Sequence, residues 1–154
     1  MIRLSAEWDD QGAVEGLRSI PALVDDKLVD TVKAVSAELQ SRLKELAPVG
    51  KDTPGRKTAP GTLRESIRYT QDGLISEFVA VDYALYVISG TRPHQIVGNP
   101  LLAFYWEKMG ANVVFASVQH PGTRASPFRD LAIVAASEFA GDELYEVAEV
   151  YERL

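Results

Sequence analysis

The sequence contains no cysteine and only two histidines. The absence of thiols excludes a disulfide framework, a cysteine nucleophile and a cysteine-based metal site, and it is typical of a reducing compartment. No run of apolar residues approaches the roughly 18 to 20 that span a bilayer. The acidic pair Asp9-Asp10 follows the N-terminus before any long apolar run. We therefore expect neither a membrane span nor a signal peptide.

Motifs that bind nucleotides or activate a serine are also missing. The chain has no G-x-x-x-x-G-K-[ST], G-x-G-x-x-G or G-x-S-x-G stretch. His94 and His120 each adjoin a proline, so we predict that both lie in turns, and neither has the i+3 or i+4 histidine partner of a helix-borne zinc site. A metal-dependent enzyme built on these two histidines stays open as one alternative.

The charge is unevenly distributed along the chain. The net charge of -6 argues against a general nucleic-acid binder, because such binding requires Lys and Arg to replace counterions on phosphates. Residues 41–70 nevertheless carry a net charge of +4, and residues 111–154 carry -4. These are either two solvated faces or complementary ends that meet between neighbouring copies. A nucleic-acid-binding module that uses the basic segment 51–68 is the alternative function.

The chain of 154 residues, 46% of them apolar, is long enough for one domain over residues 1–154. Apolar and polar residues alternate from Ile2 to Trp8, which predicts a strand with one buried face. Apolar residues then recur every three or four positions, which predicts a helix over about 20–46, roughly 40 Å long. Ala47-Pro48 ends this helix, because the residue before proline is disfavoured in the α region.

Turn residues divide the middle of the chain. Residues 49–61 are rich in Gly, Pro and charge, which predicts an exposed loop, and residues 62–67 can form one helical turn. Two β-rich runs flank Gln71-Asp72-Gly73, which predicts a hairpin whose Asp-Gly turn uses positive φ at both residues. Tyr83 to Ser89 predicts a short helix that stops at Gly90.

The last third predicts a second hairpin and a helix. The hairpin strands are expected over 102–106 and 113–118. Ser126-Pro127 supplies an N-cap and a first-turn proline for a helix that runs to about Ala140. Gly141-Asp142 is expected to interrupt it, after which residues 142–154 form an acidic C-terminal helix.

Three short blocks occur in a fixed order. They are Ala47-Pro48 with Pro60 to Ile67, then Tyr83 to Val87 with Ser89-Gly90-Thr91, then His120 to Thr123 with Pro127-Phe128. Each places backbone and aromatic side chains and carries no catalytic group, which indicates an assembly component before an enzyme. Ordinary turns do not explain the ordered set.

These blocks resemble the tail-completion (head-to-tail joining, or neck) proteins of long-tailed double-stranded DNA bacteriophages, over about residues 25–140. The resemblance implies an α+β fold, with a long N-terminal helix packed on a small antiparallel sheet of two hairpins plus an N-terminal strand, and a C-terminal helix. It implies a structural virion protein without enzymatic activity, cofactor or metal. The chain departs from the family pattern in its longer loop from Lys51 to Thr58 and in the expected break at Gly141.

The resemblance also implies partners and a location. The subunit is expected to form a ring, usually a hexamer, at the head-proximal end of the tail, where it joins tail to head. The ring would contact the neck or head-completion protein on one side and the tail terminator or tube protein on the other, and DNA would pass through its lumen without sequence-specific binding. The expected location is the virion neck, after assembly in the host cytoplasm.

The candidate site residues follow from these blocks. The structural-motif and subunit-interface candidates are Leu63, Arg64, Ser66, Tyr83, Tyr86, Gly90, Thr91, His120, Pro121, Gly122, Pro127 and Phe128. The candidates for partner or DNA-channel contacts are Lys51, Arg56 and Lys57. We expect Leu63 and Ile67 to anchor the turn after the loop, and Arg64 to reach a carboxylate of an adjacent element or subunit.

The remaining hypotheses concern the second and third blocks. Tyr83 and Tyr86 are expected to pack the short helix against the sheet. Gly90 would allow a sharp exit that Thr91 caps, and residues 120–123 would carry the chain off the second hairpin so that Phe128 fills the core.

Overall fold

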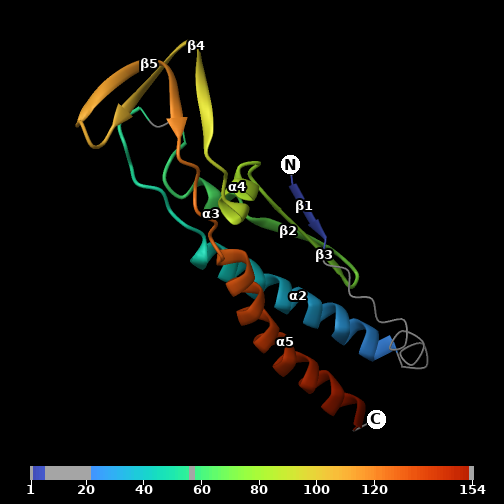
Figure 1. The fold of residues 1–154 in the computed structure, drawn as a ribbon. Coiled ribbons are helices and arrows are strands. Elements are labelled where there is room, and N and C mark those ends of the chain that lie inside the picture. Colours follow the sequence, from blue (N-terminus) through green and yellow to red (C-terminus); the bar gives the residue numbers. More distant parts are fainter. Residues whose placement is uncertain (1, 6–21, 56–57, 153–154) are drawn as a thin grey trace.

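The computed structural model describes residues 2–5, 22–55 and 58–152, with side chains described for 26–55 and 58–149. Two long helices dominate the fold: α2 (Ala22–Leu46) and α5 (Phe128–Glu152). They lie side by side and run in opposite directions (Figure 1). The predicted long helix is therefore present. Its buried side includes Leu43, and it ends before Pro48 as predicted.

A three-stranded antiparallel sheet covers the side of α2 that faces away from α5 (Figure 1). Its order is β1 (Ile2–Ser5), β3 (Ile75–Ala80), β2 (Arg68–Asp72). The predicted first strand is confirmed over Ile2–Ser5, and the rest of that prediction lies outside the described residues. Helix α2 is thus the middle layer, with the sheet on one side and α5 on the other.

The turn between β2 and β3 differs from the prediction by one residue. Asp72 pairs with Ile75, so the two-residue loop is Gly73-Leu74 and not Asp72-Gly73. Only Gly73 has positive φ, at 58°. A glycine at the first central position is the pattern of a type II′ turn. The stacked pair of Tyr69 opposite Phe78, with ring centroids 5.5 Å apart, fits this register.

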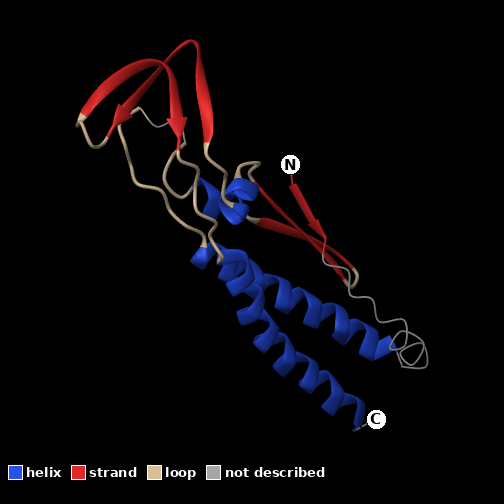
Figure 2. Cartoon of the chain, in the orientation of Figure 1, coloured by secondary structure: helices blue, strands red, loops and turns tan. Residues whose placement is uncertain are grey.

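The second hairpin forms a sheet of its own. Strands β4 (His94–Trp106) and β5 (Ala111–His120) pair with each other and project away from the long helices (Figure 2). We call this hairpin the arm. The α+β class and the predicted pair of hairpins are confirmed, but the two hairpins do not share one sheet, because α4 (Ala84–Ser89) leads the chain away from β3.

The core lies where α2, α5, the sheet and the two short helices meet. The short helices are α3 (Thr62–Ser66) and α4, both close to the predicted positions. The buried cluster consists of Leu43, Ala47, Leu63, Ile67, Phe78, Ala84, Phe128 and Ala132.

Helix α5 continues through Gly141, so the predicted break there is wrong. The residues expected to form a separate helix from 142 are its last turns, up to Glu152. Glycine costs only about 1 kcal/mol relative to alanine inside a helix, and the packing of α5 along α2 outweighs this cost. Among the described residues, no helix is both long and apolar enough to cross a membrane.

Candidate functional site

The second and third sequence blocks meet at the base of the arm. The Thr91 N–H donates to the Thr123 carbonyl at 3.0 Å, and the Thr123 N–H donates back to the Thr91 carbonyl at 3.2 Å. The two threonine hydroxyls lie 3.0 Å apart. The segment that enters β4 is therefore tied to the segment that leaves β5. We call this arrangement the threonine clamp.

Two glycines make the threonine clamp possible. Gly90 has φ +70° and Gly122 has φ +86°, a region that side chains rarely adopt. A Cβ on Gly90 would lie 2.5 Å from the Thr123 carbonyl oxygen, and a Cβ on Gly122 would overlap the Thr91 carbonyl oxygen. The predicted sharp exit at Gly90 is confirmed. Thr91, however, pairs with the opposite segment instead of capping α4.

The two histidines also face each other at this end of the arm. His94 pairs with His120 across β4 and β5, with ring centroids 5.1 Å apart. The prediction that both lie in turns is wrong, because the strands extend further toward the clamp than their apolar patterns indicate. His94 Nδ1 lies 2.9 Å from the Arg92 carbonyl oxygen, to which it can only donate.

His120 Nδ1 accepts a hydrogen bond, whereas His94 Nδ1 donates one. The Gly122 N–H donates to His120 Nδ1 at 3.0 Å, so this nitrogen is an acceptor and the neutral ring carries its proton on Nε2. This tautomer presents no free ring nitrogen to a metal. Within the described chain, no three His, Asp or Glu side chains form a group able to hold a metal ion. These hydrogen bonds hold the His94 ring at the start of β4 and the His120 ring at the end of β5.

The first and third blocks share the core. Leu63 is 3% exposed and Ile67 is 4% exposed, as predicted for anchors of the turn after the loop. Phe128 is 5% exposed in the same cluster, so its predicted core position is confirmed. Ser66 Oγ donates to the Leu63 carbonyl at 2.7 Å and accepts the Val81 N–H at 3.2 Å, which ties α3 to the end of β3.

Tyr83 packs partly buried against this core, but Tyr86 does not. Tyr86 is 60% exposed, so its predicted packing role is wrong. Ala84 is buried and Val87 and Ile88 pack inward, so a residue two positions after Ala84 points outward on a helix. Tyr86 instead lines an open depression of about 520 Å³ at the base of the arm, together with residues 91–94.

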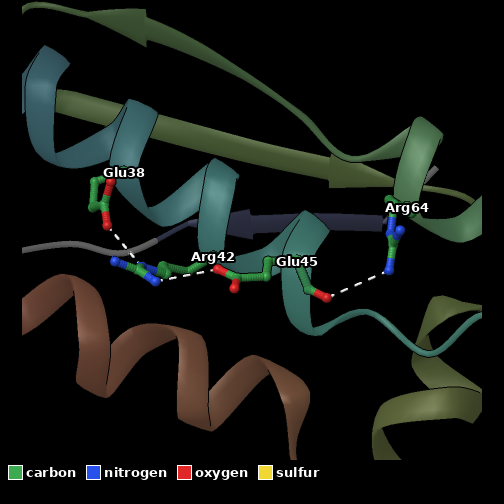
Figure 3. A network of polar contacts seen from close by, with 4 residues as sticks. All are labelled: Glu38, Arg42, Glu45 and Arg64. Carbon is green, nitrogen blue, oxygen red and sulfur yellow. Dashed lines mark hydrogen bonds and ion pairs between the residues drawn. The ribbon is translucent and has the colours of Figure 1, made fainter.

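Arg64 contacts a backbone carbonyl and not the carboxylate that we expected. Its Nη2 donates to the carbonyl oxygen of Glu45 at 3.4 Å (Figure 3). Glu45 lies in the last turn of α2, where unpaired carbonyls attract positive charge. The Arg64 Nε is buried and has no partner among the described residues.

A surface ion-pair network lies beside this contact. Arg42 Nε donates to Glu38 at 2.7 Å and Arg42 Nη1 donates to Glu45 at 3.1 Å (Figure 3). The hydrogen bond to Glu38, followed by the attraction of Glu38 and of Glu45, raises the pKa of Arg42 above its ordinary value. Because arginine is charged in any case at neutral pH, this shift adds no pH dependence there.

The structure describes only part of the basic segment. Lys51 is exposed, whereas Arg56 and Lys57 lie outside the described residues. Arg64 faces the end of α2. The two ends of the loop, with Tyr83 and Val87, line an open pocket of about 220 Å³.

The structure reveals apolar surfaces that the sequence patterns did not indicate. The exposed apolar side chains of α5 are Leu131, Ile133, Val134, Leu144 and Tyr145. On the arm, Phe104, Trp106 and Phe115 are 37–39% exposed. The described residues bury nine hydrophobic side chains, and four of these are alanines. Uncovered apolar surface of this extent beside so small a core is typical of a subunit that contacts other proteins.

Comparison with known proteins identifies no relative, because no family model, no curated protein and no solved structure matches this chain.

Proposed function

We propose that this chain is a structural virion protein that completes the head-proximal end of a long phage tail and joins the tail to the head. In this role it is one subunit of a ring, a hexamer, through which DNA passes. The observation that carries the proposal is the uncovered apolar surface on α5 and on the arm. The resemblance of the three ordered blocks supplies the kind of assembly. The role is structural and not catalytic.

The arrangement of the three blocks supports the proposal. The first and third blocks contribute to one core, and the second and third blocks form the threonine clamp. Together they hold the arm to the body of the subunit through backbone hydrogen bonds on both of its connecting segments. An arm held in this way is suited to a fixed contact with a neighbouring protein, because little conformational freedom is lost on binding.

The partners follow from the same role. One side of the ring contacts the neck or head-completion protein, and the other contacts the tail terminator or tube protein. The location is the virion neck, with assembly in the host cytoplasm. The net charge of -6 suits a channel that does not retain DNA, since retention would require excess Lys and Arg on the lumen.

Labelling of particles tests the proposed location. An antibody against the chain, coupled to gold, is expected to mark the junction of head and tail in particles of the phage that carries the gene. Image averages of the purified protein or of the neck should show a ring with a central opening. Labelling along the tube, on the capsid or on no particle would contradict the proposal.

Salt titration separates the proposal from the nucleic-acid-binding alternative. A ring subunit should bind duplex DNA weakly at physiological salt, and neutralising Lys51, Arg56 and Lys57 together should change that binding little. Tight binding that falls steeply with salt and disappears in the neutralised variant would favour the alternative.

A further inference from the structure

The middle of α5 contains a glycine that its own chain does not explain. Gly141 lies inside a continuous helix, where glycine is less favourable than alanine. A Cβ at this position would meet no atom within 4 Å. Internal packing therefore does not require glycine here. Close approach of another backbone is one use of glycine that would account for it.

Exposed apolar side chains surround this glycine. At about 100° per residue, Gly141 lies on the side of the helix opposite the fully buried Ala132. Ile133 and Leu144 flank it on one side of the outer face, and Val134 and Tyr145 flank it on the other. The outer face of α5 thus carries exposed apolar side chains around a low point at Gly141, with Asp130, Ser137 and Glu138 as polar residues among them.

The arm carries a second uncovered apolar face. The register places Leu102, Phe104 and Trp106 of β4 on the same face as Val113 and Phe115 of β5. Phe115 contacts both aromatic neighbours, with ring centroids 6.1 Å from Phe104 and 6.0 Å from Trp106. Among the described elements, β4 and β5 make their extensive contacts only with each other. A two-stranded hairpin is marginally stable without further packing.

We propose that the aromatic face of the arm in one copy lies on the outer face of α5 in the next copy, over Gly141. This inference rests on the proposed ring function and names the contact that builds the ring. The arm and α5 extend from the core in opposite directions, so the arm points away from the α5 of its own chain (Figure 1). A head-to-tail contact covers both surfaces, and it builds a ring when the rotation from one copy to the next closes. Pairing of α5 with α5 would leave the arm uncovered.

The size of the two surfaces fits one interface. The exposed parts of the three arm aromatics, together with the five exposed apolar side chains of α5, amount to roughly 700–850 Å² when an aromatic residue is taken as about 200–250 Å² and an aliphatic one as about 160–180 Å². The smallest specific interfaces bury roughly 1,000 Å² in total. Polar residues around the two faces must supply the remaining buried area of such an interface.

The cysteine-free sequence permits a direct cross-linking test. Ser117→Cys places a thiol on the aromatic face of the arm, and Ser137→Cys places one on the outer face of α5. The two single variants are mixed and treated with a short bismaleimide. The expected product is a dimer that joins the two variants. The matched control is Ala116→Cys, on the opposite face of β5, which should give several-fold less product with Ser137→Cys.

A second pair of variants tests the role of Gly141. Gly141→Gln should raise the melting temperature of the dilute monomer, because glutamine favours the helix and the space is open. The same substitution should raise the dissociation constant of self-association at least about tenfold. Glu138→Gln, one turn earlier, introduces the same side chain without added bulk and should leave association nearly unchanged.

Each contrary result overturns this contact. Such results are cross-links only between two Ser137→Cys chains, equal products from both faces of the arm, or unchanged association of Gly141→Gln. A chain that stays monomeric without cross-links at its highest soluble concentration also overturns it. Gold labelling of the virion neck decides the proposed function separately. A labelled neck with α5 paired to α5 would therefore reject only the arm contact.

Discussion

The threonine clamp leads to a quantitative prediction for Gly122→Ala. Gly122 has φ +86°, and an alanine in this region costs about 1–2 kcal/mol. Its Cβ would also overlap the Thr91 carbonyl oxygen and lie 2.9 Å from the Arg92 carbonyl carbon. Both neighbours are backbone atoms, so the two segments must move apart. Forcing a methyl group into packed structure costs about a further 1–3 kcal/mol.

Gly61→Ala is the matched control for this prediction. Gly61 has φ +84°, almost the same angle, but a Cβ there would meet nothing within 4 Å. It should therefore lose only the conformational part, about 1–2 kcal/mol. The difference between the two variants measures the close approach in the clamp, about 1–3 kcal/mol.

Urea unfolding followed by circular dichroism gives the loss of unfolding free energy for both variants. Amide hydrogen exchange of Thr123, whose N–H donates to Thr91, reports the clamp itself. We expect this amide to exchange faster in Gly122→Ala and unchanged in Gly61→Ala. Equal losses of stability, with Thr123 protected alike in both, would refute the reasoning.

Three further predictions concern the core, the histidines and the helix–sheet contact. Phe128→Ala should lower the unfolding free energy by about 3–5 kcal/mol, while Leu131→Ala, at a site 54% exposed, should cost less than about 1 kcal/mol in the same urea assay. His120→Ala should speed hydrogen exchange of the Gly122 amide, whose N–H donates to His120 Nδ1. His120→Asn keeps an acceptor near that position and should restore protection of this amide. Equal exchange of the Gly122 amide in both variants would contradict the assigned tautomer. Ser36→Ala and Ser76→Ala should each cost about 1 kcal/mol and be non-additive in the double variant, because their hydroxyls share one hydrogen bond of 2.6 Å.

Local signals in the sequence predicted most of the secondary structure. Pro48 ends α2 and Gly90 ends α4 because their backbone constraints act wherever the rest of the chain lies. The turn after β2 was predicted one residue too early. Asp72-Gly73 and Gly73-Leu74 are both acceptable two-residue loops. The register with the Gly73-Leu74 loop is the one that places Tyr69 opposite Phe78, where the two rings stack.

These local signals do not predict contacts between residues far apart in the sequence. The pairing of His94 with His120 depends on the register of strands whose outer parts are polar and show no apolar alternation. The partner of Arg64 is a carbonyl group, which every residue carries, so no sequence pattern marks it. The sequence shows the helix-destabilising cost of Gly141, which predicts a helix break. It does not show the packing of α5 on α2 that outweighs this cost.

The position of α5 after the other core elements in the sequence has a consequence for synthesis. Phe128 and Ala132 complete a core whose other members come from residues 43–84. A nascent chain that has left the ribosome only as far as β5 therefore has one apolar side of α2 open to water, and such exposed surface makes a chain prone to aggregation. The same helix carries the outer face that we propose as the docking surface. A subunit therefore becomes competent to join its neighbours only after translation has delivered the helix that closes its own core.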